Sequence, residues 1–270
     1  MVSNLFTHNR YIYCFLLFFF ILLLGSYNIS IAYAASVNIT INLQINAGLM
    51  TLSSDPTSTL STITLSTSSQ NATGDLGLVD AADSRGTGVG WTLTDAASNF
   101  IQVETPITVS GSHNTLSSGG TYTGTTAGTY TVTIATGGSA GVSTYTVSGL
   151  ETQGTTTTGS TVLIGTHGVT ATFGAATYTT GDSWTIRVDL IPVTDFTQSP
   201  GSVSAIVGSL TGMNSGSSHT FSSTSDTATL ASAPSGDGMG EYTLDPNLSL
   251  AVPANTYTGS YSATITLTAQ

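Results

Sequence analysis

A serine motif and three histidines are the first residues of this chain that suggest catalysis. Residues 137–141 read Gly-Gly-Ser-Ala-Gly, which satisfies the G-x-S-x-G pattern of a nucleophile elbow. An elbow needs a strand that enters a helix, whereas this match lies between two strand-like segments and is typical of a hairpin turn. His113, His167 and His219 are far apart and form no close pair of metal ligands. We therefore expect no enzyme activity, no metal and no other cofactor.

Carboxylates are the remaining candidates for catalysis or cation binding. The chain has 14 Asp and Glu residues, and the sequence marks no two of them as a glycosidase pair, because that separation is spatial. Asp75, Asp80 and Asp83 supply oxygen ligands of the kind that Ca²⁺ prefers, but they lack the spacing of a calcium loop. A secreted hydrolase and a calcium site stay open as alternatives.

The segment with the most distinctive spacing runs from Asp83 to Leu93 and reads DSRGTGVGWTL. Its three glycines permit positive φ and a close approach to the next strand. An arginine fork beside a carboxylate favours a clamp that holds the loop. A tryptophan at this place is either a core residue or, if it is partly exposed, a ligand platform. The candidate binding residues are Asp83, Arg85, Gly86, Gly88, Gly90, Trp91 and Leu93.

The elements that must position these residues have the pattern of β-strands. Residues 37–45 alternate apolar Val, Ile and Leu with Asn, Thr and Gln, and residues 256–268 alternate in the same way. Gly, Ser, Asn, Asp and Pro clusters separate the strands. We predict an all-β protein with two antiparallel β-sandwich domains of Ig-like or Greek-key type. Further strand-like runs lie at 62–66, 89–94, 129–134, 144–148, 169–173 and 184–190.

A change in composition divides the chain into an outer and an inner part. Threonine and glycine density rises between about residues 105 and 191, and Pro106 and Pro192 bracket that segment. About 87 residues suffice for a small sandwich. We predict a discontinuous sandwich formed by residues 35–104 plus 192–270, with residues 105–191 inserted as a second sandwich in one of its loops.

The N-terminus has the features of a secretory signal. Residues 11–24 are an apolar run that follows Arg10, and they are shorter than the roughly 20 residues of a membrane-spanning helix. Ala32-Tyr33-Ala34 matches the A-x-A pattern of signal peptidase. We predict a signal helix within residues 1–34, cleavage before Ala35 and no membrane span afterwards. An uncleaved N-terminal anchor is the alternative.

The charge composition restricts the partners of the exported chain. Only 6% of the residues are charged, none is lysine, and the net charge is −11. Binding to nucleic acid through the phosphate backbone needs a field of Lys and Arg, so we exclude it. The abundance of Thr and Ser instead favours strands with hydroxyl-covered outer faces.

Two outer segments together resemble the WxL-type family of cell-wall-associated surface domains. The first is the Asp83–Leu93 segment, and the second is LSLAVPA at residues 248–254, followed by the alternating segment from Tyr257 to Leu267. The family often has a second W-x-L near the end, where this chain has Ile265-Thr266-Leu267. The resemblance implies a β-sandwich on a Gram-positive-type cell surface, attached non-covalently to peptidoglycan. The inner part is similar to Thr/Gly-rich β-modules of phage-tail and surface-fibre proteins, through residues 168–173 and 181–186.

These observations lead to one expected function and, besides the hydrolase named above, one alternative. We expect a secreted, non-catalytic cell-surface protein that associates with peptidoglycan or another wall polymer and displays the inserted domain as a spacer or adhesive head. The alternative is a pilus or fibre subunit whose copies assemble by β-strand addition. Residues 37–45 are well suited to complete a neighbour's sheet edge.

Overall fold

The computed structural model describes residues 13–22, 43–111 and 115–270. The chain divides into two compact units, Met1–Ile45 and Asn46–Gln270. In the first unit, residues 13–22 are helical and exposed. Among the described residues, no helix has both the length and the apolar character needed to cross a membrane. The predicted cleavage site before Ala35 lies outside the described residues.

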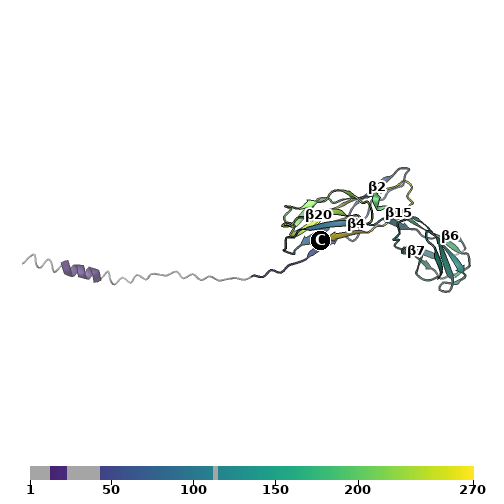
Figure 1. Cartoon of the computed structure of the whole chain (residues 1–270), viewed down its shortest axis with the longest axis horizontal. Coiled ribbons are helices and arrows are strands. Elements are labelled where there is room, and N and C mark those ends of the chain that lie inside the picture. The colour runs from purple at the N-terminus through teal and green to yellow at the C-terminus, as the bar shows by residue number, and fades with distance from the viewer. Residues whose placement is uncertain (1–12, 23–42, 112–114) are drawn as a thin grey trace, which may run out of the picture. The chain divides into compact units, whose positions relative to one another are not determined.

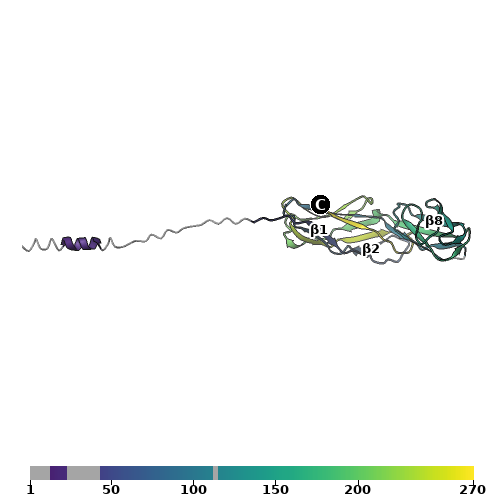
Figure 2. The same ribbon diagram turned by 90° about the horizontal axis from the view of Figure 1, so that it is seen from below.

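The outer segments of the second unit form three antiparallel sheets. The first has the order β1 (Met50–Ser54), β3 (Val79–Asp83), β21 (Gly240–Leu244) and β17 (Ser204–Gly208). The second has the order β19 (His219–Thr220), β16 (Phe196–Ser199), β22 (Asn247–Val252) and β2 (Gln70–Asp75). The third has the order β18 (Asn214–Ser215), β20 (Ala228–Ala233), β4 (Trp91–Ala97) and β23 (Ile265–Ala269). In Figure 2, β1 and β2 lie with the green and yellow strands from the end of the chain.

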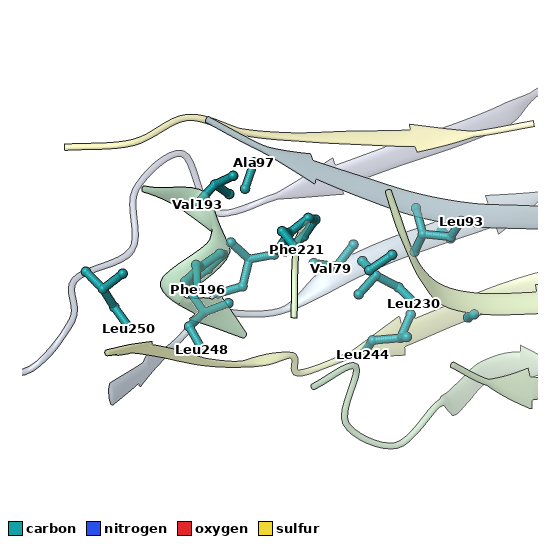
Figure 3. Packing of buried hydrophobic residues seen from close by; sticks show 14 of the residues in the cluster. Val79, Leu93, Ala97, Val193, Phe196, Phe221, Leu230, Leu244, Leu248 and Leu250 are labelled. Carbon is teal, nitrogen blue, oxygen red and sulfur yellow. The ribbon is translucent and has the colours of Figure 1, made fainter. Parts of the chain in front are cut away.

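Buried residues from all three sheets pack into one core, which we call the outer core. The three sheets around it are called the outer sandwich. Strand β4 shows why, because its residues alternate between buried and half-buried positions from Trp91 to Ala97. Figure 3 shows Leu93, Leu230 and Val79 pointing into this core. Phe196 stacks on Phe221 with ring centroids 5.7 Å apart. The core therefore joins segments from before and after the inner part of the chain.

The inner segments form a second set of sheets. The largest has the order β11 (Gln153–Thr157), β10 (Thr144–Gly149), β8 (Gly128–Thr136), β15 (Ser183–Ile191) and β5 (Phe100–Val103), and β6 (Ile107–Ser110) also pairs with β15. A second sheet has the order β12 (Val162–Leu163), β13 (Val169–Phe173) and β7 (Leu116–Gly120), and β14 (Thr177–Tyr178) pairs with β9 (Gly138–Ser139). Figure 1 shows β6 and β7 together in the teal part of the chain.

The inner segments bury their own aromatic cluster, which we call the inner core. Phe173 and Tyr178 meet edge to face at 5.6 Å, and Trp184 lies 5.9 Å from Tyr178. Edge-to-face pairs of this kind add to the stability that burial alone provides. The two cores agree with the all-β sandwich class that the sequence predicts. The boundaries at residues 105 and 191 stay a prediction, since residues 46–270 form one compact unit.

The inner part is entered and left through two strands that pair with each other. Val103 is the register partner of Val188, and Phe100 is the partner of Ile191. On its other side, the earlier part of β15 pairs with β8, from Ser183 to Val188. After β15, the 3-10 helix Val193–Asp195 leads back into the outer core. The inner part is therefore held at its base by a continuous antiparallel pair.

Three of the predicted strand segments differ from the structure. Residues 43–45 belong to no strand, and residues 37–42 lie outside the described residues. Residues 62–66 form no strand either, although Ser61 N donates to Thr73 O, which places this segment beside β2. The alternating segment 256–268 becomes a strand only from Ile265, because residues 254–259 form turns and bends. Alternation alone therefore overestimates strand length where a turn interrupts the pairing.

Candidate functional site

The candidate residues surround the loop of residues 84–90, which connects β3 to β4. Asp83 ends β3 with its side chain fully buried, and Arg85 binds it with both arms of its fork. Nε donates to Oδ1 and Nη2 to Oδ2, both at 2.9 Å. Nη2 also donates to the carbonyl oxygen of Gly90 at 2.7 Å. One side chain thus joins the residue before the loop to the last residue of the loop.

The electrostatics of the loop follow from this clamp. The side-chain hydrogen bonds from Arg85 lower the pKa of Asp83 and outweigh the opposing effect of burial. The same bonds raise the pKa of the Arg85 guanidinium. Both groups are therefore charged at neutral pH, and a bidentate pair of this type is strong and geometrically specific. The Asp83–Arg85 pair is therefore a clamp of the kind that the sequence analysis favours for this loop.

The three glycines of the loop have positive φ, at 69° for Gly86, 63° for Gly88 and 78° for Gly90. The packing differs sharply along the loop. A Cβ on Gly90 would lie 2.4 Å from the carbonyl oxygen of Ala233, whereas a Cβ on Gly86 would meet nothing within 4 Å. Gly90 is therefore needed for close approach to the 233–234 backbone, and Gly86 only for its backbone angle.

Trp91 lies in the outer core and is only 3% exposed. Its Nε1 donates to the carbonyl oxygen of Gly238 at 2.8 Å, and its ring lies 5.8 Å from that of Tyr242. Leu93, two positions along β4, is fully buried. Of the two interpretations that the sequence leaves open, the structure agrees with the core residue, since a ligand platform needs an exposed ring.

The surface that the motif offers to a ligand is the apex of the loop. Gly88 O accepts hydrogen bonds from Gly236 N at 2.7 Å and from Ser235 Oγ at 3.2 Å. The apex is therefore joined to the turn at residues 234–237. Val89 is 60% exposed on this apex, and Thr87 is exposed beside it. We call residues 86–89 together with Ser235 the loop apex.

Arg187 occupies a second polar centre, at the base of the inner part. It pairs with Glu104 and, through Nε, with Asp189 at 2.9 Å. Its guanidinium carbon lies 3.4 Å from the ring centroid of Tyr257. A cavity of about 400 Å³ lies next to this centre, lined by Gln102, Val103, Glu104, Thr105, Ile107, Thr258 and Ser260.

The residues that suggest catalysis do not assemble into a reactive site in the described part of the chain. Ser139 ends β9, and its carbonyl oxygen accepts from Val142 N and Ser143 N, so the G-x-S-x-G match forms a turn between strands. His219 Nε2 lies 3.0 Å from Asp226 Oδ2, and His113 falls outside the described residues. Among the described residues, no group of three or more His, Cys, Asp or Glu side chains gathers at metal-binding distance.

Glu151 joins two turns of the inner part through four polar groups that belong to three residues. It accepts from Tyr130 OH at 2.7 Å and from Thr166 N at 3.0 Å and Oγ1 at 2.5 Å, and His167 Nδ1 lies 2.9 Å away. Burial raises the pKa of Glu151, but the hydrogen bonds from Thr166 and Tyr130 dominate and lower it to about 2. This carboxylate therefore stabilises the fold and is too weak a base to catalyse proton transfer at neutral pH.

Asp95 is the unusual residue that the sequence analysis missed. It is 1% exposed on β4, and neither carboxyl oxygen has a hydrogen-bond partner within the described residues. Desolvation raises its pKa to about 6. The period of two that places Trp91 and Leu93 in the core also places Asp95 there, so the alternation itself was a sufficient signal.

Comparisons of the chain with family models, curated proteins and solved structures found no match. The class of the protein therefore follows from its fold, which is an antiparallel all-β sandwich with two separate cores.

Proposed function

We propose that this chain is a secreted, non-catalytic cell-surface protein that associates with peptidoglycan or another wall polymer. The outer sandwich would bind the wall, and the inner part would project as a spacer or adhesive head. The observation that carries the proposal is the loop of residues 84–90, which the Asp83–Arg85 clamp fixes while its apex stays exposed. The WxL-like spacing of the same segment supports this proposal.

The chemistry of the loop apex agrees with a glycan ligand. The apex offers backbone amides, the hydroxyl groups of Thr87 and Ser235, and the apolar side chain of Val89, with no charged side chain among them. Sugars bind through the same combination of hydrogen bonds and apolar contact. Because Trp91 is buried, its role would be to hold the loop from beneath.

Sedimentation with purified peptidoglycan tests this proposal. We expect the full-length protein to sediment with wall fragments at physiological salt, and Val89→Asp to reduce the bound fraction about tenfold, as the loss of about 1.4 kcal/mol would. Val142→Asp is the matched control, because Val142 is 69% exposed in the inner part. If the wild type stays in the supernatant, wall association is wrong. If both variants bind equally well, the loop apex is not the site.

A second candidate function is a fibre subunit that assembles by β-strand addition. Leu43 is 82% exposed and Ile45 is 84% exposed, although both belong to an alternating apolar segment. An alternating segment of this kind becomes stable when its apolar face is covered. A neighbouring copy could provide that cover, and the two functions are compatible in one surface protein.

A further inference from the structure

The segment from Ser262 to Gln270 forms an edge of the outer sandwich with one unpaired side. Ser262 and Ile101 exchange both backbone hydrogen bonds, and so do Gln270 and Thr92. In an antiparallel ladder, alternate residues direct their N–H and C=O groups to opposite sides. Ala263, Ile265, Leu267 and Ala269 therefore point these groups away from β4. No second strand pairs with β23 among the described residues.

The side chains of this edge leave the outer core incompletely covered. Burial alternates without interruption from residue 261 to residue 270. The five inward-facing side chains pack against the outer core but stay only partly buried. An added strand would cover them and pair with the outward-facing backbone groups in one step. These five residues are Tyr261, Ala263, Ile265, Leu267 and Ala269.

Other edges of the outer sandwich are shorter or protected. Strand β17 has a bulge between Ala205 and Val207, and bulges discourage pairing at an edge. Residues near Ser61 run beside β2. Strand β1 is regular, but only Met50 and Leu52 face the core from it. The 262–270 edge is the longest of these edges, and it has no charge and no proline. Its pairing is regular from Thr264 to Gln270, and the register shifts by one residue before the bridge of Ser262 to Ile101.

Residues 37–45 match this edge in length and pattern. They are nine residues long, like the 262–270 segment, and they carry five apolar side chains at alternating positions. They also contain no charged residue and no proline. The structure describes two of these apolar side chains, Leu43 and Ile45, and both are more than 80% exposed.

We propose that residues 37–45 of one copy add as a strand to the 262–270 edge of a second copy. This inference rests on the fibre-subunit function and identifies the surface that accepts the strand. The apolar side chains of the donor cover Ile265 and Leu267, while its Asn, Thr and Gln side chains form the opposite face of the added strand. The repeated contact is heterologous, so it produces a chain of subunits.

Disulfide trapping tests the proposed pairing directly. Two full-length chains, both with Cys14→Ser, carry Asn42→Cys and Thr266→Cys respectively, near the middle of each segment, so that either strand orientation brings the thiols close. We expect mixed samples to form a disulfide-linked heterodimer at least tenfold more than a mixture of Asn42→Cys with Ser204→Cys on β17. Equal yields with both partners, or no heterodimer with either, would overturn the proposed acceptor edge.

Light scattering separates the failure of this pairing from the failure of the proposed function. We expect the wild type to form assemblies, and the double variant Leu43→Asp/Ile45→Asp to be monomeric with unchanged circular dichroism. Asn42→Asp is the matched control, since it adds charge to the polar face and should still assemble. A monomeric wild type overturns both the fibre function and the pairing. Assembly that persists in the double variant overturns only the pairing. Sedimentation with peptidoglycan reports on wall association independently.

Discussion

At the scale of single residues, Asp95 departs most from its surroundings. Its carboxyl group is buried on β4 without a hydrogen-bond donor in the described part of the chain, and desolvation raises its pKa to about 6. A group whose folded pKa exceeds its unfolded pKa stabilises the fold only while it is protonated. Stability from this group is therefore present below about pH 3.8 and is lost as the pH rises through about 6.

Replacement of Asp95 by Asn should stabilise the protein in a pH-dependent way. The difference between pKa values of about 6 and 3.8 corresponds to roughly 3 kcal/mol at pH 8. We expect Asp95→Asn to gain up to that amount at pH 8 and clearly less at pH 5, measured by urea unfolding at both values. Asp55→Asn serves as an exposed control. A gain that is independent of pH would show that ionisation of Asp95 is not its cause.

Trp91 should behave as a core residue in stability measurements. We expect Trp91→Ala to lower the free energy of unfolding by about 3–5 kcal/mol, because a large buried side chain leaves a cavity. Trp91→Phe keeps most of the packing but leaves Gly238 O without its indole donor, so we expect a loss of about 1–3 kcal/mol. A Trp91→Ala variant with wild-type stability would contradict the buried position.

At the scale of elements, the loop of residues 84–90 separates two roles of glycine. Gly86 and Gly90 both have positive φ, but only Gly90 faces the neighbouring backbone closely. We expect Gly86→Ala to cost about 1–2 kcal/mol through its backbone angle alone. Gly90→Ala should cost clearly more, since Ala233 and Pro234 would have to move. Thermal unfolding of the two variants measures the difference, and equal costs would contradict the close packing at Gly90.

Glu151 should make the stability of the inner part sensitive to acid. Its pKa is lowered to about 2 by hydrogen bonds that only the charged form accepts fully. A lowered folded pKa stabilises the fold above the unfolded pKa of about 4.5, and this stability is lost as the pH falls toward 2. We expect Glu151→Gln to be less stable than the wild type at pH 6 and to lose less on acidification to pH 3, measured by thermal unfolding. Parallel losses in both proteins would argue against this role.

The sequence was a good guide to the elements whose side chains alternate without interruption. Strands β4, β8, β10, β13 and β15 all lie where alternation predicts them. The prediction was poorer where tertiary contacts decide, as at residues 62–66, which follow β2 without forming a strand. It also left the position of Trp91 open, because exposure depends on Gly238 and Tyr242, which come about 150 residues later in the sequence.

At the scale of the whole molecule, the pairing of β5 with β15 predicts that the inner part can be removed. Val103 and Val188 are neighbours across that pair, so a two-residue Asn-Gly turn could connect them in place of residues 104–187. We expect this shortened protein to fold with a cooperative unfolding transition and with Trp91 still buried, as near-ultraviolet circular dichroism would report.

A longer deletion provides the control for this experiment. Removal of residues 99–192 would also take away Phe100 and Ile191, which belong to the outer core, and we expect that variant to be unfolded. If the 104–187 deletion is also unfolded, the outer sandwich depends on the inner part, and the prediction of an inserted domain is wrong.

Arg85 and Arg187, which are ion-paired in the described part of the chain, also bear on resistance to proteolysis. Trypsin-like proteases cleave after Lys or Arg, and the chain has no lysine and only three arginines. Arg85 and Arg187 are both held by carboxylates beside paired strands, where cleavage would require local unfolding. Trypsin should therefore cut the folded sandwiches slowly, and the appearance of fragments ending at Arg85 or Arg187 would report separately on the opening of the loop and of the base of the inner part.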